Sequence, residues 1–154
     1  WTLNHDSKIV ASAYSKIGLI SNRDVDDFFH YFGGGLPGIK GYTFYDSTLT
    51  GANLWINTLS LRVPVFLEKN YKLLHLNLQN LSIGGILQAG GGFNSEVQDW
   101  IKNQKYKLSG GLELRLSGYS FYIYPVALSY EYHLPIDDQN EEKGKSYLSI
   151  LFDF

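Results

Sequence analysis

The stretch YKLSGGLELRLS, Tyr106–Ser117, alternates with a period of two residues. Its even positions, from Leu108 to Leu116, are apolar or small, and its odd positions are polar or small. Successive side chains of a β-strand point to opposite faces, so this pattern predicts a strand with one apolar face and one polar face. The stretch sets the fold class that we expect for the whole chain, which is all-β and antiparallel.

Similar alternation appears in four other stretches, and a Gly-rich stretch near the middle of the chain is less regular. The sequence therefore predicts six strands, at 8–20, 52–65, 81–92, 106–117, 120–134 and 145–154. The set Leu74, Leu76 and Leu78 is out of phase with Leu81 and Ile83. We expect a turn or a bulge between the two sets.

The connections between these strands alternate in length. A tight turn is predicted at Ser117–Ser120, whereas Ile20–Gly51, Phe93–Lys105 and Pro135–Gly144 are long, and Phe66–Asn80 is an exception on the short-turn side. Outer-membrane barrels have short periplasmic turns and long external loops, which favours a barrel with its C-terminus at the periplasm. A soluble antiparallel sandwich also alternates and remains the structural alternative.

The composition excludes several classes of protein. Aromatic residues make up 16% of the chain, and charged residues make up 18%, below the roughly 25% of soluble domains. A net charge of −2 offers no basic surface for nucleic acid, and the lack of Cys excludes disulfides. No apolar run approaches the ~20 residues of a membrane-spanning helix. Because the chain starts at Trp1 and contains no Met, we expect an N-terminal part of the protein to be missing.

One loop carries a motif. The segment FGGGLPGIKGY, Phe32–Tyr42, resembles the signature loop of the BamA-like outer-membrane assembly factors, also called the bacterial surface antigen family, in which F-x-G-G leads into V-R-G-F/Y. Ile39-Lys40-Gly41-Tyr42 resembles that tetrapeptide. Downstream, Leu59–Val65 resembles the family's E-L-R-F-P-L strand and Leu87–Gly90 resembles its F-D-A-G strand. The resemblance covers essentially the whole chain in order.

The resemblance implies a transmembrane β-barrel of about sixteen strands in the outer membrane of a Gram-negative bacterium. Residues 1–154 would supply its C-terminal part, and the aromatic end of the last strand, Ile150, Phe152 and Phe154, resembles the C-terminal signal of barrel proteins. An open edge would leave backbone groups unpaired in lipid. The expected partners are therefore the lipid bilayer and the remaining barrel strands or other subunits of an outer-membrane complex.

In that family the loop folds into the barrel lumen, and its Arg is held by acidic groups on the two following strands. Here Lys40 replaces the Arg, Ser60 and Gln88 stand where the acids are expected, and Arg62 lies close to Ser60 on the same strand. A guanidinium binds carboxylates bidentately, whereas an ammonium with neutral partners gains less. We therefore expect Lys40 to lie near Ser60 and Gln88, held by hydrogen bonds to neutral partners or by an acid that the sequence does not identify. Arg62 is a further candidate partner of the loop.

Other motifs have simpler explanations. Gly33–Gly38 satisfies G-x-G-x-x-G, but Pro37 opposes the helix that dinucleotide binding requires. The isolated His75 and His133 have no recognisable nucleophile arrangement in the sequence. Four loop residues suggest a metal site but match no ligand spacing: Asp24, Asp26, Asp27 and His30. We expect no catalytic residue, cofactor or metal.

The Tyr residues of the fifth strand form two pairs near its opposite ends: Tyr122, Tyr124, Tyr130 and Tyr132. Their spacing favours two aromatic girdles at the bilayer interfaces over a platform for stacking sugars. Three functional hypotheses follow: a barrel for translocation or membrane assembly of polypeptides, a barrel that serves as a membrane anchor or as a subunit of a larger complex, and a soluble β-sandwich binding module.

Overall fold

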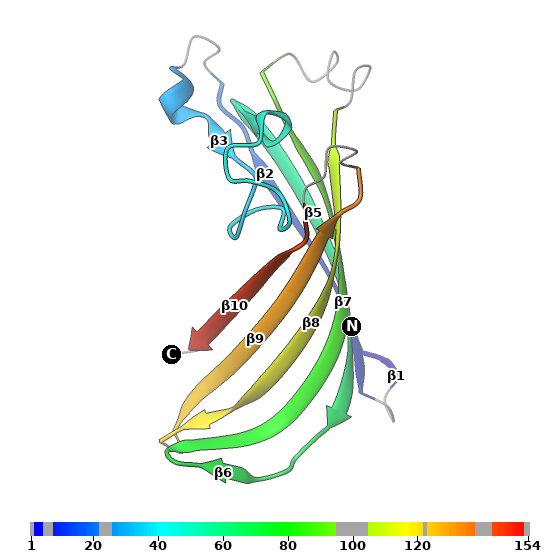
Figure 1. Ribbon diagram of the computed structural model, residues 1–154, viewed down its shortest axis with the longest axis vertical. Coiled ribbons are helices and arrows are strands. Elements are labelled where there is room, and N and C mark those ends of the chain that lie inside the picture. Colours follow the sequence, from blue (N-terminus) through cyan, green and yellow to red (C-terminus); the bar gives the residue numbers. More distant parts are fainter. Residues whose placement is uncertain are drawn as a thin grey trace.

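A computed structural model of the chain describes residues 2–4, 8–21, 26–94, 105–121, 123–137 and 143–152. Its main feature is a single bent antiparallel sheet whose strands follow one another in chain order (Figure 1). The strand order is β1-β2-β5-β7-β8-β9-β10, and β6 pairs with β7. The all-β antiparallel class is therefore confirmed. Within the described residues the sheet is open, with β1 and β10 at its edges.

Each of the six predicted strands corresponds to one long strand of the structure, and the structure adds several short strands. The main sheet contains β1 (Thr2–Asn4), β2 (Ile9–Gly18), β5 (Asn53–Phe66), β6 (Tyr71–Leu73), β7 (Leu76–Phe93), β8 (Lys107–Ser120), β9 (Tyr124–Pro135) and β10 (Lys145–Phe152). A small second sheet pairs β3 (Tyr31–Phe32) with β4 (Thr50–Gly51), and the 3-10 turns are η1 (Asp27–Phe29) and η2 (Ser47–Leu49). Among the described residues, no helix has the length and apolar character needed to cross a membrane.

The boundary of β7 differs from the prediction. The strand begins at Leu76 rather than at residue 81, and the stretch 66–80, expected to be a connection, contains β6 and the start of β7. The predicted irregularity between Leu78 and Leu81 is confirmed as a bulge. Its register shift lies between Leu78 and Asn80 in the pairing with β8, and an extra residue of this kind reverses the phase of the alternation.

The hairpin turn between β8 and β9 was also predicted at the wrong place. Strand β8 continues to Ser120 and β9 begins at Tyr124, so the turn follows Ser120 and does not lie at Ser117–Ser120. The Ile123 N–H donates to the Ser120 carbonyl at 3.2 Å. Phe121 has a positive φ of 48°, a conformation that Gly or Asn usually adopts, and its ring stacks on that of His75 with centroids 4.7 Å apart. Because Phe is not a typical turn residue, residue type did not indicate this turn.

The two faces of the sheet differ in chemistry. Residues paired across antiparallel strands share a face. The register therefore assigns each side chain of the long strands to one of the two faces of the sheet. The outward face is apolar and carries Ala11, Ala13, Ile17, Leu59, Leu61, Val63, Ile83, Leu87, Leu112, Leu114, Leu116, Leu128, Leu134, Leu148, Ile150 and Phe152. The inward face is mainly polar and carries Ser12, Thr58, Ser60, Arg62, Gln88, Ser109, Glu113, Arg115, Ser129, Glu131, His133, Tyr147 and Ser149.

Candidate functional site

Residues 33–49, which we call the inner loop, pack against one end of the inward face (Figure 1). The loop turns back on itself, because the Gly33 N–H donates to the Leu49 carbonyl and the Ile39 N–H donates to the Gly33 carbonyl, each at 2.7 Å. A Cβ atom at Gly38 would collide with the Gly33 carbonyl, so this close approach requires glycine. The segment after the glycines forms a turn rather than a helix, and the dinucleotide interpretation has no structural support.

Two residues of the motif form the apolar part of the site. Ile39 and Tyr42 are completely or almost completely buried, in a cluster with Leu49 of the loop and with Leu54 and Ile56 of β5. The Tyr42 hydroxyl donates to a β8 backbone carbonyl, that of residue 108, at 2.6 Å. Burying a large apolar side chain contributes about 1.5–3 kcal/mol. These two side chains therefore fix the loop to the sheet.

Gln88 of β7 recognises the backbone of the motif. The Lys40 N–H donates to Gln88 Oε1 at 2.9 Å, and Gln88 Nε2 donates to the Gly38 carbonyl at 3.3 Å. The same amide nitrogen also donates to Thr58 Oγ1 at 3.2 Å. The predicted proximity of Gln88 and Lys40 is confirmed, but the contact is made with the backbone of Lys40 and not with its ammonium group.

The Lys40 ammonium contacts a carboxylate that the sequence analysis did not identify. Its Nζ lies 2.5 Å from Glu131 Oε2 on β9, and the two side chains are only 17% and 8% exposed. Of the two alternatives, neutral partners or an unidentified acid, the structure therefore shows the acid, and a charged pair is retained. Ser60 makes a hydrogen bond of 2.6 Å with Ser12 instead, and Arg62 pairs with Glu113.

The motif also contacts the edge strand β10. The Gly41 N–H donates to the Tyr147 hydroxyl at 2.9 Å, and Lys40 Nζ lies 5.9 Å from the centroid of the Tyr147 ring, within the range of a cation–π contact. Gly41 has a φ of +98°, a backbone conformation that residues other than glycine rarely adopt. The short sequence 39–42 is thus connected to β5, β7, β8, β9 and β10.

The Glu131 carboxylate contacts a buried histidine as well as Lys40. His133 Nε2 lies 2.8 Å from Glu131 Oε2, and His133 Nδ1 lies 3.4 Å from Ser109 Oγ. The sequence analysis found no nucleophile beside His133, and the structure places this hydroxyl there. Both Ser109 and His133 are 0% exposed, so a substrate has no access to the hydroxyl in this conformation. The arrangement stabilises the carboxylate that holds Lys40.

A second charged cluster lies on the same face. Arg62 binds Glu113 through two nitrogens, with Nε 2.5 Å from Oε2 and Nη2 3.4 Å from Oε1. The Ser129 hydroxyl donates to Glu113 Oε1 at 3.1 Å, and Arg115 Nη1 lies 3.9 Å from the same oxygen. The Glu113 side chain is 2% exposed. A buried carboxylate needs such partners because desolvation alone would be costly.

The remaining predicted residues are placed as follows. His30 Nδ1 lies 3.4 Å from Asp27 Oδ1, and the described residues contain no group of three potential metal ligands. Ile150 and Phe152 are 59% and 53% exposed on the outward face. Tyr124, Tyr130 and Tyr132 are 48%, 47% and 40% exposed on the outward face, and Asp26 is exposed beside η1. Asp24, Tyr122 and Phe154 lie outside the described part of the chain.

The arrangement holds a loop in place on a polar surface. The alternation of β9 puts Glu131 on the inward face, and the strand register and the position of the loop bring it to Lys40. Comparison of the chain with protein-family models, with curated proteins and with solved structures gives no match.

Proposed function

We propose that this chain forms part of the wall of an outer-membrane β-barrel in a Gram-negative bacterium, and that the barrel translocates polypeptides across that membrane or inserts them into it. The observation that carries the proposal is the inner loop, which is held by Lys40 and Glu131 on the polar face of a sheet whose other face is apolar.

The outward face supports a position in a lipid bilayer. Its side chains are widely exposed, with Leu112 and Leu148 at 67% and Leu87 at 57%. In a soluble sandwich, a second sheet would cover such a face, and within the described residues no second layer does so. Contiguous apolar surface of this kind needs an apolar environment, and lipid chains provide one around a barrel.

The inward face supports a polar lumen. Its carboxylates are paired with cations of other elements, Glu113 with Arg62 of β5 and Glu131 with Lys40 of the inner loop. Charged side chains within a membrane protein face the interior or a water-filled cavity and pair with one another. The sheet therefore has the two-sided character of a barrel wall.

The open edges of the sheet support the proposal that further strands pair with it. The outer side of β10 has no partner strand among the described residues, and unpaired backbone groups in lipid cost several kcal/mol each, by order of magnitude. The remaining strands of a barrel of about sixteen would come from residues outside this sequence or from another subunit.

The inner loop favours translocation or assembly over simple anchoring. A membrane anchor requires only the wall, whereas this chain fixes a loop at several points of the inward face through Ile39, Lys40, Gly41 and Tyr42. A loop fixed in a lumen determines the shape of the passage. The resemblance of this motif to that of outer-membrane assembly factors agrees with such a role.

Conditional depletion in the encoding bacterium tests the proposal. We expect depletion to reduce the folded amount of other outer-membrane proteins or the surface amount of exported polypeptides, measured by quantitative mass spectrometry of the isolated membrane. Complementation with the wild-type protein should restore these amounts. Complementation with Lys40→Arg, which keeps the cation, should restore more than Lys40→Ala.

Two other outcomes would contradict the proposal. If depletion releases one domain or complex from the membrane while other membrane and exported proteins are unchanged, the barrel is an anchor and the translocation proposal is wrong. If the full protein is extracted from membranes by alkaline carbonate without detergent, the membrane assignment itself is wrong.

A further inference from the structure

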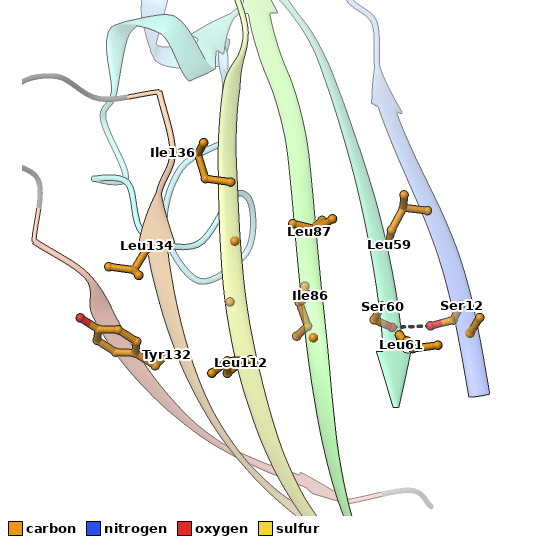
Figure 2. Close-up of a pocket in the computed structure, with 14 residues that line it drawn as sticks. Ser12, Leu59, Ser60, Leu61, Ile86, Leu87, Leu112, Tyr132, Leu134 and Ile136 are labelled. Carbon is orange, nitrogen blue, oxygen red and sulfur yellow. Dashed lines mark hydrogen bonds between the residues drawn. The ribbon is translucent and has the colours of Figure 1, made fainter. Parts of the chain in front are cut away.

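A hollow interrupts the outward face where β7 and β8 lie side by side (Figure 2). Its volume is about 750 Å³, and the side chains of Leu61, Leu87, Leu112 and Leu134 contribute to its lining. This volume lies within the ~300–1,000 Å³ typical of sites that hold small molecules. The hollow lies on the side of the sheet opposite to the inner loop.

Two glycines account for the hollow. One row of paired outward positions contains Leu59, Leu87, Gly110 and Leu134, and the next contains Leu61, Gly85, Leu112 and Tyr132. Each row therefore lacks one side chain, and the gaps lie on adjacent strands. A Cβ atom added at Gly85 would meet no atom within 4 Å, which shows that the space above it is open.

The lining offers an occupant apolar contact and few hydrogen-bonding groups. The nearby hydroxyls of Ser12 and Ser60 belong to the inward face and bond to each other at 2.6 Å (Figure 2). Tyr132 supplies the phenol among the lining side chains. An occupant that carried unsatisfied polar groups would lose its hydrogen bonds to water without replacement. A flexible hydrocarbon chain has no such groups.

We infer that the hollow is a binding site for one acyl chain of a membrane phospholipid. The inference rests on the proposed position of the sheet in a membrane, because the hollow is continuous with the face that we assign to lipid. Because the chain comes from an apolar surrounding, dispersion contacts bind it here. Leucines on both sides contact the chain, where a smooth wall would offer contacts on one side only.

Photo-crosslinking of the full protein in phosphatidylcholine vesicles tests this site. The vesicles contain a small fraction of phosphatidylcholine with a diazirine on one acyl chain, and the adducts are mapped by mass spectrometry. We expect several-fold more adducts at Leu87 and Leu112 than at Ile83 and Leu114, which occupy the next row of the same strands. Gly85→Leu fills the hollow and should abolish this excess.

Ala89→Leu is the matched control, because it adds the same kind of bulk to the outward face of β7 outside the lining, and it should retain the excess. If Gly85→Leu does not fold, Gly110→Leu fills the hollow from β8, where an added Cβ meets only flexible side-chain atoms of Ile136 and Leu87. Equal labelling of the pair Leu87 and Leu112 and the pair Ile83 and Leu114 in inserted wild-type protein, or an unchanged excess in the filled variant, would overturn the site alone. Failure of the wild-type protein to insert would overturn the membrane assignment.

Discussion

At the scale of single residues, the central contact is between Lys40 and Glu131. The Lys40 ammonium is a point charge and does not need the planar bidentate geometry of a guanidinium. Glu131 Oε2 accepts from Lys40 at 2.5 Å and lies 2.8 Å from His133 Nε2, while the Ser129 Oγ lies 3.4 Å from the other oxygen. The carboxylate is therefore well coordinated even though Lys40 replaces the expected arginine.

We predict that Lys40→Ala destabilises the folded protein strongly. Removing one partner of a buried ion pair typically costs about 3–5 kcal/mol, and we expect the lower end because His133 remains beside Glu131. The midpoint of urea unfolding, followed by heat-modifiable mobility on gels, measures the loss. Lys40→Arg is the control and should keep most of the stability. A double-mutant cycle with Glu131→Gln in which the two losses simply add would contradict a direct contact.

At the scale of the elements, alternation of apolar and polar residues predicted the long strands well. It worked because one face of each strand is apolar and the other is polar, as in β8 and β9. It failed near Leu76, where the bulge between Leu78 and Asn80 reverses the phase, and at the turn near Phe121, whose residue type is atypical for a positive φ.

The candidate site was predictable only in part. Gln88 was expected beside Lys40 because its position in the family's strand pattern holds the acid, and the structure places it there. An acid was left open as an alternative partner of Lys40, but the sequence did not identify it as Glu131, because it does not show how far the loop extends along β9. Ser60 was expected as a partner of Lys40, but its hydroxyl forms a hydrogen bond with that of Ser12, and the Lys40 ammonium contacts Glu131.

The two faces of β10 give a matched prediction. Ile150 points outward and Leu151 points inward, and they are 59% and 46% exposed. A Lys on the lipid face costs up to about 4 kcal/mol at the bilayer midplane and less near the interface, whereas lumen positions tolerate charge. We expect Ile150→Lys to lower the yield of folded protein in vesicles and Leu151→Lys to lower it much less. Equal losses in the two variants would contradict the assignment of the faces.

At the scale of the whole molecule, the sheet has two unlike ends. One end carries the inner loop and the long connection that contains η1, and the other carries β6 and the turn between β8 and β9 (Figure 1). If the sheet belongs to an outer-membrane barrel, the loop end faces the exterior, because barrels have long loops outside and short turns in the periplasm.

Cysteine labelling on intact cells tests this orientation. The chain contains no Cys, so a single introduced thiol is the only site in this sequence for a membrane-impermeant maleimide. We expect Asp26→Cys, exposed beside η1, to react, and Ile123→Cys, 72% exposed in the opposite turn, to react only after the cells are opened. Labelling of Ile123→Cys alone on intact cells would show that the barrel has the reverse orientation.

The contact between Lys40 and Glu131 joins residues 91 positions apart in the sequence, and this separation makes the ion pair a late-forming contact by its entropic cost. The carboxylate reaches its place only when β9 has paired with β8. Closing so long a segment has an entropic cost that grows with the logarithm of its length, and contacts between distant residues form slowly. In a partly folded state that lacks β8 and β9, the loop can therefore be held only by Gln88 and by its apolar cluster, and the ion pair requires both of those strands.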